Sequence, residues 1–168
     1  MSRYKTEERD GVKYWYLNGD LHREDGPAVE YPDGAKSWWL YSKLHRVDGP
    51  ALEYADGTKE WYQEGDRHRE DGPAAEHADG TKWWYINGMR HRADGPAIEY
   101  PSGAKSWLVN DKRHREDGPA VEWADGTKGW CINGLEMSKE EFIKKIKKKK
   151  FTAAEIASLK SYGIELKS

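Results

Sequence analysis

The sequence lacks the features that mark several common protein classes. It has one cysteine, Cys131, which cannot form a disulfide within the chain, so a disulfide scaffold is excluded. No apolar run approaches the 18 or so residues that a membrane-spanning helix needs, and no basic-then-apolar leader begins the chain. Hydrophobic residues make up only 36% of the sequence, with two Phe. We therefore expect a soluble, unexported protein, read as cytoplasmic.

Charge also limits the choice of function. The chain carries 28 Lys and Arg against 30 Asp and Glu, a formal net charge of -2. The residues from 135 onward hold nine Lys and five Glu, which leaves 19 basic and 25 acidic residues before them. The main body is acidic, so it has no basic face suited to nucleic acid.

Aromatic residues are abundant and regularly spaced. Nine Trp and ten Tyr argue against the disorder that a mean hydropathy of -1.07 would otherwise suggest. The sequence His-Arg-x-Asp-Gly-Pro-Ala occurs five times at intervals of 23 residues, without insertion or deletion. A Lys and a Trp keep the same period from Lys13 and Trp15 onward. Such strict spacing predicts a stack of equivalent units.

Each unit has two short alternating runs, such as residues 27–31 and 36–41, that are typical of β-strands. Asp33-Gly34 between them is a strong hairpin signal, and a second turn follows at Asn18-Gly19 and its equivalents. If the hairpin closes on Asp33-Gly34, Tyr31 faces Lys36 and Val29 faces Trp38. Both central turn residues would then have positive φ.

That register predicts an aromatic core. Val29, Tyr31, Trp38 and Leu40 would share one face of the sheet, and their equivalents would continue as a ladder through the array. Glu30, Ser37 and Trp39 would share the other face.

We expect a mainly β fold, an antiparallel β-hairpin repeat array with a twisted or solenoid-like sheet. Residues 1–134 would form about five and a half 23-residue repeats, and residues 135–168 a helical cap. Two capping boxes, Ser138-x-x-Glu141 and Thr152-x-x-Glu155, predict helices at about 138–149 and 153–162, the second ending at Gly163. Their apolar faces would cover the last hairpin.

The pattern Asn-Gly-x-x-His, then Tyr-x-Asp-Gly-x-Lys-x-Trp, resembles the MORN repeat, particularly its bacterial and phage variant that also occurs in YwqK-type antitoxin-like proteins. The resemblance covers roughly residues 4–134. MORN repeats usually have His-Gly-x-Gly where this chain has His-Arg-x-Asp-Gly-Pro. The resemblance implies an antiparallel hairpin array that serves as a binding or scaffolding module.

The repeated polar residues are better explained by structure than by chemistry. Equivalent side chains in successive repeats lie about 10 Å apart, too far for one zinc ion at ~2.0–2.1 Å from each ligand, so no metal site is predicted. A catalytic site brings unlike residues together once, whereas these recur in equivalent surroundings, so no catalytic residue and no cofactor is predicted. We expect a structural ladder in which Arg23 bridges Asp25 or Glu30, Asp25 accepts from loop amides, and the His packs on an aromatic ring with one nitrogen at a backbone carbonyl. The ladder comprises His22, Arg23, Asp25, His45, Arg46, Asp48, His68, Arg69, Asp71, His91, Arg92, Asp94, His114, Arg115 and Asp117.

A second set of aromatics lies next to the periodic Trp, one residue after it at Tyr16, Trp39, Tyr62 and Tyr85, and one before it in the run Trp83-Trp84-Tyr85; some of these side chains would point away from the core. Exposed aromatic strips mark interaction surfaces, so Tyr16, Trp39, Tyr62, Trp83 and Tyr85 are candidate partner-binding residues.

The first hypothesis is a non-enzymatic scaffold, monomeric or weakly dimeric, that binds a protein partner. The resemblance implies an antitoxin-like or phage-encoded inhibitor of a host defence protein. A small-ligand binder that stacks a nucleotide or sugar, and an enzyme using His and Asp of one repeat, remain open. So does a nucleic-acid role for the Lys-rich run at residues 144–150, although a solvated helix face is the simpler reading.

Overall fold

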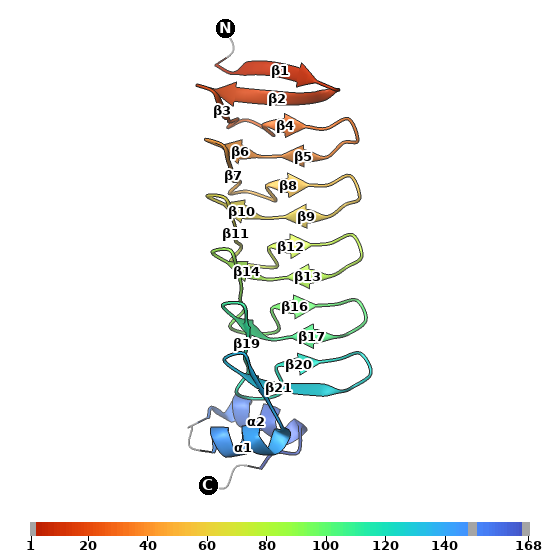
Figure 1. The fold of residues 1–168 in the computed structure, drawn as a ribbon, viewed down its shortest axis with the longest axis vertical. Helices are drawn as coiled ribbons and strands as arrows, with labels where there is room; N and C mark the ends of the chain where they lie inside the picture. Colours follow the sequence, from red (N-terminus) through yellow and green to blue (C-terminus); the bar gives the residue numbers. More distant parts are fainter. Residues whose placement is uncertain (1–2, 148–150, 166–168) are drawn as a thin grey trace. The chain divides into compact units, whose positions relative to one another are not determined.

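The computed structural model describes residues 3–147 and 151–165, which form 22 strands and two helices. The fold is mainly β with antiparallel hairpins and two C-terminal helices, as the sequence predicts. The chain divides into two compact units, Met1–Met89 and Arg90–Ser168. Each unit is described by itself, and Figure 1 shows the elements of both.

The strands of the first unit are β1 Lys5–Arg9, β2 Val12–Leu17, β3 Asp20–Leu21, β4 Val29–Glu30, β5 Lys36–Ser37, β6 Trp39–Leu40, β7 Lys43–Leu44, β8 Leu52–Glu53, β9 Lys59–Glu60, β10 Tyr62–Gln63, β11 Asp66–Arg67, β12 Ala75–Glu76, β13 Lys82–Trp83 and β14 Tyr85–Ile86. Strand β15 is Met89–Arg90. The second unit contains β16 Ile98–Glu99, β17 Lys105–Ser106, β18 Leu108–Val109, β19 Lys112–Arg113, β20 Val121–Glu122, β21 Lys128–Ile132, β22 Leu135–Met137, α1 Lys139–Ile146 and α2 Ala153–Ser161.

Hairpins lie side by side in each unit. The sheet order is β1-β2-β4-β5-β8-β9-β12-β13 in Met1–Met89 and β16-β17-β20-β21-β22 in Arg90–Ser168 (Figure 1). Short second hairpins, β6–β7, β10–β11 and β18–β19, branch off these sheets. Every repeat therefore supplies one hairpin to the main sheet and one beside it.

The first hairpin turn corrects the predicted register. Only Asp10-Gly11 has positive φ at both residues, whereas in later copies only the Gly does, as at Gly34 (φ 91°). There the loop is longer: the Tyr31 amide bonds to the Ala35 carbonyl, and the Asp33 carboxylate accepts from the Ala35 amide. Val29 consequently pairs with Ser37 and Glu30 with Lys36, so the predicted pairs of Val29 with Trp38 and Tyr31 with Lys36 are wrong.

The second turn matches its prediction. Both central residues have positive φ at Asn18-Gly19, Glu64-Gly65, Asn87-Gly88, Asn110-Asp111 and Asn133-Gly134, and also at Tyr41-Ser42. This is the geometry of a type I′ turn, whose twist suits a two-residue hairpin. Hence each short second hairpin closes over two residues.

The corrected register sorts the side chains into two rows. One is a row of alternating charge: Lys13 pairs with Glu30, Glu30 with Lys36, and Lys36 with Glu53. It continues to Lys82 in the first unit, and the second unit repeats it from Glu99 to Lys128. The other row, on the opposite face, is partly or fully buried. It contains Tyr14, Val29, Ser37, Leu52, Glu60, Ala75 and Trp83, then Ile98, Ser106, Val121 and Gly129.

The predicted aromatic core is therefore wrong at the position of Tyr31, although Val29 and its equivalents Ile98 and Val121 are buried as predicted. The Tyr31, Tyr54 and Tyr100 side chains are 41–45% exposed, because the longer loop moves them to the end of the hairpin. The motif alanines take the core positions instead: Ala28, Ala51, Ala74, Ala97 and Ala120 are all 0% exposed. Their methyl groups are buried where the loop returns to the sheet.

The helices begin where the capping boxes predict. Ser138 and Thr152 are the N-caps, each bonded reciprocally with a Glu three residues later. The α2 helix ends in a Schellman motif, in which the Gly163 amide (φ 68°) bonds to Lys160 and the Ile164 amide to Leu159. The predicted end of the first helix, near 149, lies outside the described residues. Both described helices are too short and too polar to cross a membrane.

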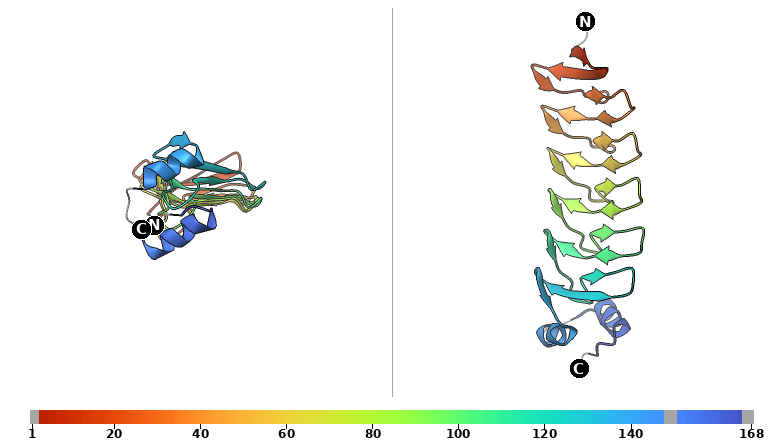
Figure 2. Two further views of the ribbon diagram at one scale, coloured as in Figure 1. Left: turned by 90° about the horizontal axis from the view of Figure 1, so that it is seen from below. Right: turned by 45° about the vertical axis from the view of Figure 1, so that its right-hand side comes forward.

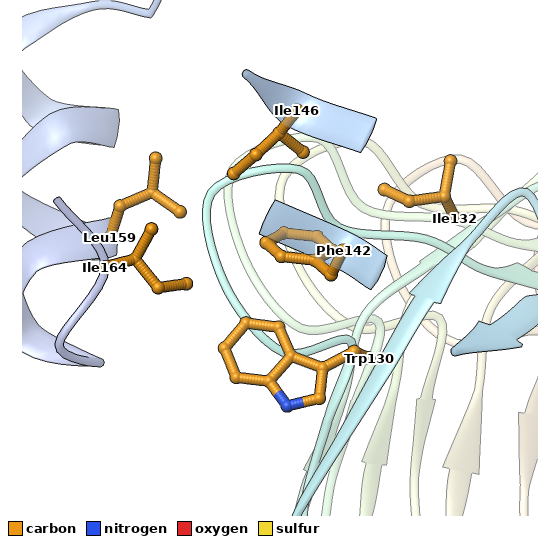
Figure 3. Close-up of a cluster of buried hydrophobic side chains, with 6 residues drawn as sticks. All are labelled: Trp130, Ile132, Phe142, Ile146, Leu159 and Ile164. Carbon is orange, nitrogen blue, oxygen red and sulfur yellow. The ribbon is translucent and has the colours of Figure 1, made fainter. Parts of the chain in front are cut away.

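An apolar cluster lies between the helices and the last hairpin. It joins Trp130 and Ile132 of β21 to Phe142, Ile146, Leu159 and Ile164 (Figure 3). Figure 2 shows α1 and α2 beside β21 and β22. In the last repeat Ser138 stands where the motif has Arg, and the Phe142 ring contacts Trp130 with centroids 4.8 Å apart. The predicted packing of both helices on the last hairpin is confirmed.

Candidate functional site

The motif arginine lies between an indole ring and a glycine. The guanidinium carbons of Arg23, Arg46, Arg69 and Arg115 sit 4.0–4.4 Å from the ring centroids of Trp15, Trp38, Trp61 and Trp107, respectively. This is a cation–π stack. On the other side lies the motif glycine: a Cβ on Gly72 would come within 2.9 Å of the Arg69 Cζ. The φ of this glycine is not positive, so its backbone conformation does not call for glycine. The residue is small because a Cβ would crowd the guanidinium.

The edges of the guanidinium are also occupied. In all five copies Nε donates to the motif Asp at 2.8–2.9 Å, and Nη1 donates to the motif Pro carbonyl at 3.2–3.4 Å. Nη1 also lies 3.0–3.5 Å from the Glu seven residues on, such as Glu53 for Arg46. The predicted bridges from Arg23 to Asp25 and Glu30 are confirmed.

The carboxylate of the motif Asp accepts its hydrogen bond from the motif arginine. Asp48, Asp71 and Asp94 have a pKa below the ordinary value because the Arg two residues earlier donates to the carboxylate. The turn residues Asp56, Asp79 and Asp125 also have a lowered pKa, through bonds from Thr58, Thr81 and Thr127. General acid–base catalysis is most efficient when the pKa lies near the operating pH, and these hydrogen bonds shift the pKa of the carboxylates in the opposite direction.

The motif histidine holds the turn of the next repeat. Nδ1 of His22, His45, His68 and His114 accepts from the backbone amide 19 residues on, at 3.1–3.2 Å. The Nδ1 of His91 lies 2.9 Å from Oδ1 of Asn110. The predicted backbone carbonyl is not the partner of Nδ1 in the described hydrogen bonds: a turn amide lies there in four copies, and at His68 and His91 the Oδ1 of the turn Asn also lies 2.9 Å from Nδ1. These contacts support a turn residue with positive φ. The predicted aromatic contact is present at His22, which packs on Tyr41 at 4.4 Å.

Nothing in this arrangement assembles a metal site. Across residues 3–147 and 151–165, no group of three or more His, Cys, Asp or Glu side chains is placed to hold an ion. Cys131 is buried, and burial raises the pKa of its thiol. The repeated polar side chains are thus committed to one another and to the backbone.

Open grooves separate successive motif loops. One groove of about 490 Å³ has Arg23, Asp25, Trp38, His45 and Asp48 among its lining residues, and the next, of about 500 Å³, lies between the loops of Arg46 and Arg69. In the second unit, a groove of about 480 Å³ lies between the loops of Arg92 and Arg115, with Glu155 of α2 at its wall. The walls combine paired charged groups, such as Arg46 and Asp48, with apolar side chains such as Trp38.

The candidate partner-binding residues are mostly packed within the chain. Trp39 donates its indole N–H to Ser37 at 2.6 Å, and Tyr62 donates its hydroxyl to Glu60 at 2.8 Å. Tyr85 is only 8% exposed, whereas Tyr16 and Trp83 are half-buried. Trp83 belongs to the buried row itself, and the other four side chains contact that row rather than stand clear of it.

Glu60 is the one carboxylate in that buried row, at 4% exposure. Arg67 binds both of its oxygens, at 2.9 and 3.1 Å, while the Tyr62 hydroxyl donates to it. Burial and this carboxylate raise the pKa of Tyr62 well above its usual value. The cluster is a satisfied ion pair in the core of one repeat.

A different aromatic row is exposed. Tyr31 and Tyr54 occupy the same repeat position and are 43% and 45% exposed; in the second unit, Tyr100 and Trp123 occupy it, at 41% and 42%. His77 holds this position in the intervening copy, with its ring 5.0 Å from Trp83. This row was not predicted, because the register expected from the sequence put Tyr31 in the core. The Pro-Asp-Gly and Ala-Asp-Gly sequences after it are the signal for a longer loop.

Helix α2 covers one copy of the motif. The Tyr162 hydroxyl donates to Glu122 at 2.6 Å and lies 3.4 Å from Nη1 of Arg115, while Ser158 Oγ accepts from Nη2 at 3.2 Å. The last repeat is thus capped partly through the motif itself.

Comparison with known proteins gives no assignment: no family model matches the sequence, and no curated protein matches it.

Proposed function

We propose that the chain is a non-enzymatic scaffold whose repeat array binds a protein partner. The observation that carries the proposal is the row of half-exposed aromatic side chains at one repeat position, Tyr31 and Tyr54 in the first unit and Tyr100 and Trp123 in the second. Tyr and Trp are enriched at the centres of protein interfaces because they bury much apolar area at small entropic cost.

The surroundings of the row suit binding rather than catalysis. It lies at the ends of hairpins, and successive copies should be about 10 Å apart, two strand spacings. The His, Arg and Asp that could do chemistry are bonded to one another and to the backbone. The antitoxin-like role that the MORN resemblance implies would be steric: the row would occupy a surface that the partner needs.

The test is a comparison of complexes formed by matched variants. Tyr31→Ser with Tyr54→Ser should leave the unfolding midpoint nearly unchanged and abolish stoichiometric capture of the partner. Tyr41→Ser is the control, because Tyr41 is 62% exposed but lies at a second turn. Undiminished capture by the double variant, or equal loss with the control, would refute the proposal.

A small ligand is the second candidate, favoured by the same row. Rings repeated at about 10 Å could stack a nucleotide or a sugar chain. Native mass spectrometry of the purified protein distinguishes the two, since a bound small molecule adds a discrete mass. The Lys-rich run gains no support: Lys144 and Lys145 lie in the last turn of α1, where they complement the helix dipole, and residues 148–150 lie outside the described residues.

A further inference from the structure

The contact between α2 and the last complete motif shows how a helix recognises this motif. Besides the hydrogen bonds of Tyr162 and Ser158, the Tyr162 ring packs on the motif glycine: a Cβ on Gly118 would meet its Cε2 at 2.9 Å. The Arg115 guanidinium lies 5.6 Å and the Lys128 ammonium 5.2 Å from the centre of the ring. One tyrosine thus touches the Gly, Arg, Glu and Lys of a repeat.

Ser158 and Tyr162 are four residues apart, so they project from the same side of the helix. They sit at its C-terminal end, where Lys139 donates to the Tyr162 carbonyl at 2.7 Å. The carbonyl at this end is thus bonded to Lys139, and the side chains of Ser158 and Tyr162 make the contacts with the motif. Hydrogen bonding by these two side chains favours the last turn of a helix here.

The covered motif can be compared with open ones of identical geometry. The Asp117 side chain is 30% exposed and that of Arg115 12%. In the first unit Asp71 is 84% exposed and Arg69 24%, and Asp48 and Arg46 are similar at 83% and 23%. Cover by α2 thus roughly halves the exposure of the arginine and removes most of that of the aspartate.

The uncovered motifs in the first unit contain the same Arg, Glu and Lys as the motif that α2 covers. Arg46, Glu53 and Lys59 correspond in sequence to Arg115, Glu122 and Lys128, and Arg46 makes the same bonds to its Asp, Pro and Glu. Arg69, Glu76 and Lys82 repeat the set. Both loops border the groove of about 500 Å³ described above.

We propose that the motifs of Arg46 and Arg69 bind the C-terminal turn of an α-helix from a partner protein that carries Ser and, four residues later, Tyr. The tyrosine hydroxyl donates to Glu53 or Glu76, its ring packs on Gly49 or Gly72, and the serine accepts from the arginine. This surface lies on the charged face of the sheet, opposite the buried row, and does not depend on the exposed aromatic row.

The test uses the full chain, labelled with ¹⁵N, and a synthetic peptide of residues 151–165 as the probe. The peptide should shift the Nε–H signals of Arg46 and Arg69 and the indole signals of Trp38 and Trp61 in a saturable way. A matched peptide with Ser158→Ala and Tyr162→Phe should bind about 10-fold or more weakly, since it loses hydrogen bonds to charged groups.

Two further results would overturn the proposal. One is the absence of shifts at Arg46 and Arg69 at millimolar peptide, where even a weak helix contact is detectable. The other is equal binding of the two peptides, or shifts confined to Tyr31 and Tyr54, which would place any contact on the aromatic row.

Discussion

Replacement of Gly72 by Ala tests the stacked arginine most sharply. The new Cβ would lie 2.9 Å from Cζ and 3.1 Å from Nε of Arg69, with the Trp61 ring 4.2 Å away on the other side. The guanidinium cannot retreat without leaving the ring or its bonds to Asp71 and the Pro73 carbonyl. Such overpacking costs about 1–3 kcal/mol, which lowers the melting temperature of a chain this long by a few degrees per kcal/mol.

The cause can be isolated with a double-mutant cycle. In an Arg69→Ala background the space is empty and φ at residue 72 is ordinary, so Gly72→Ala should be neutral or stabilise by about 0.4–1 kcal/mol through the unfolded chain. Urea unfolding followed by tryptophan fluorescence measures all four variants, with constant m-values as the check that unfolding stays cooperative. An equal cost of Gly72→Ala in both backgrounds would refute the sandwich.

Three other variants probe separate parts of the fold. The pKa of Asp71 is lower in the folded protein than in the unfolded chain, so the ionised carboxylate stabilises the fold above its unfolded pKa, and that stability is lost as the pH falls through the folded pKa. Below about pH 4 the unsubstituted protein should therefore lose stability that the Asp71→Asn variant lacks at every pH. Parallel acid-unfolding curves for the two proteins would contradict this. Glu60→Ser should lower the free energy of unfolding by about 1–3 kcal/mol, because it leaves Arg67 unpaired. Adding Arg67→Leu gives the residues of the preceding repeat, Ser37 and Leu44, and should recover part of that free energy in urea unfolding. A further loss of stability in the double variant would argue against a buried pair. Phe142→Ala should cost about 3–5 kcal/mol in the second unit and red-shift tryptophan emission as Trp130 is uncovered, whereas an unchanged spectrum would place the ring elsewhere.

The period of 23 residues predicted the repeated hairpins and the second turns, and the two capping boxes predicted the helical starts, because each depends on local chemistry. Asn18-Gly19 needs positive φ, and Ser138 and Thr152 have Glu three residues on. The arginine bridges were also accessible, since Asp25 and Glu30 lie within its reach along the chain.

The register was not accessible in the same way. A shift of one residue at Asp33-Gly34 moves every side chain to the other face, and the sequence alone allows both a two-residue and a longer loop. Because of that shift, Tyr31 was expected in the core. The stack of Arg46 on Trp38, two residues that are eight apart in the sequence, was not predicted. The histidine contact spans 19 residues and depends on the same geometry.

The motif arginine is a fixed structural element between an indole and a glycine. Nitrogen-15 NMR of the arginine side chains tests this directly in the unmodified protein. We expect separate Nε–H signals for Arg46 and Arg69, shifted upfield by the rings of Trp38 and Trp61 and slow to exchange, and Trp61→Leu should move only the Arg69 signal to the ordinary position. A single averaged signal at the position of free arginine would contradict it.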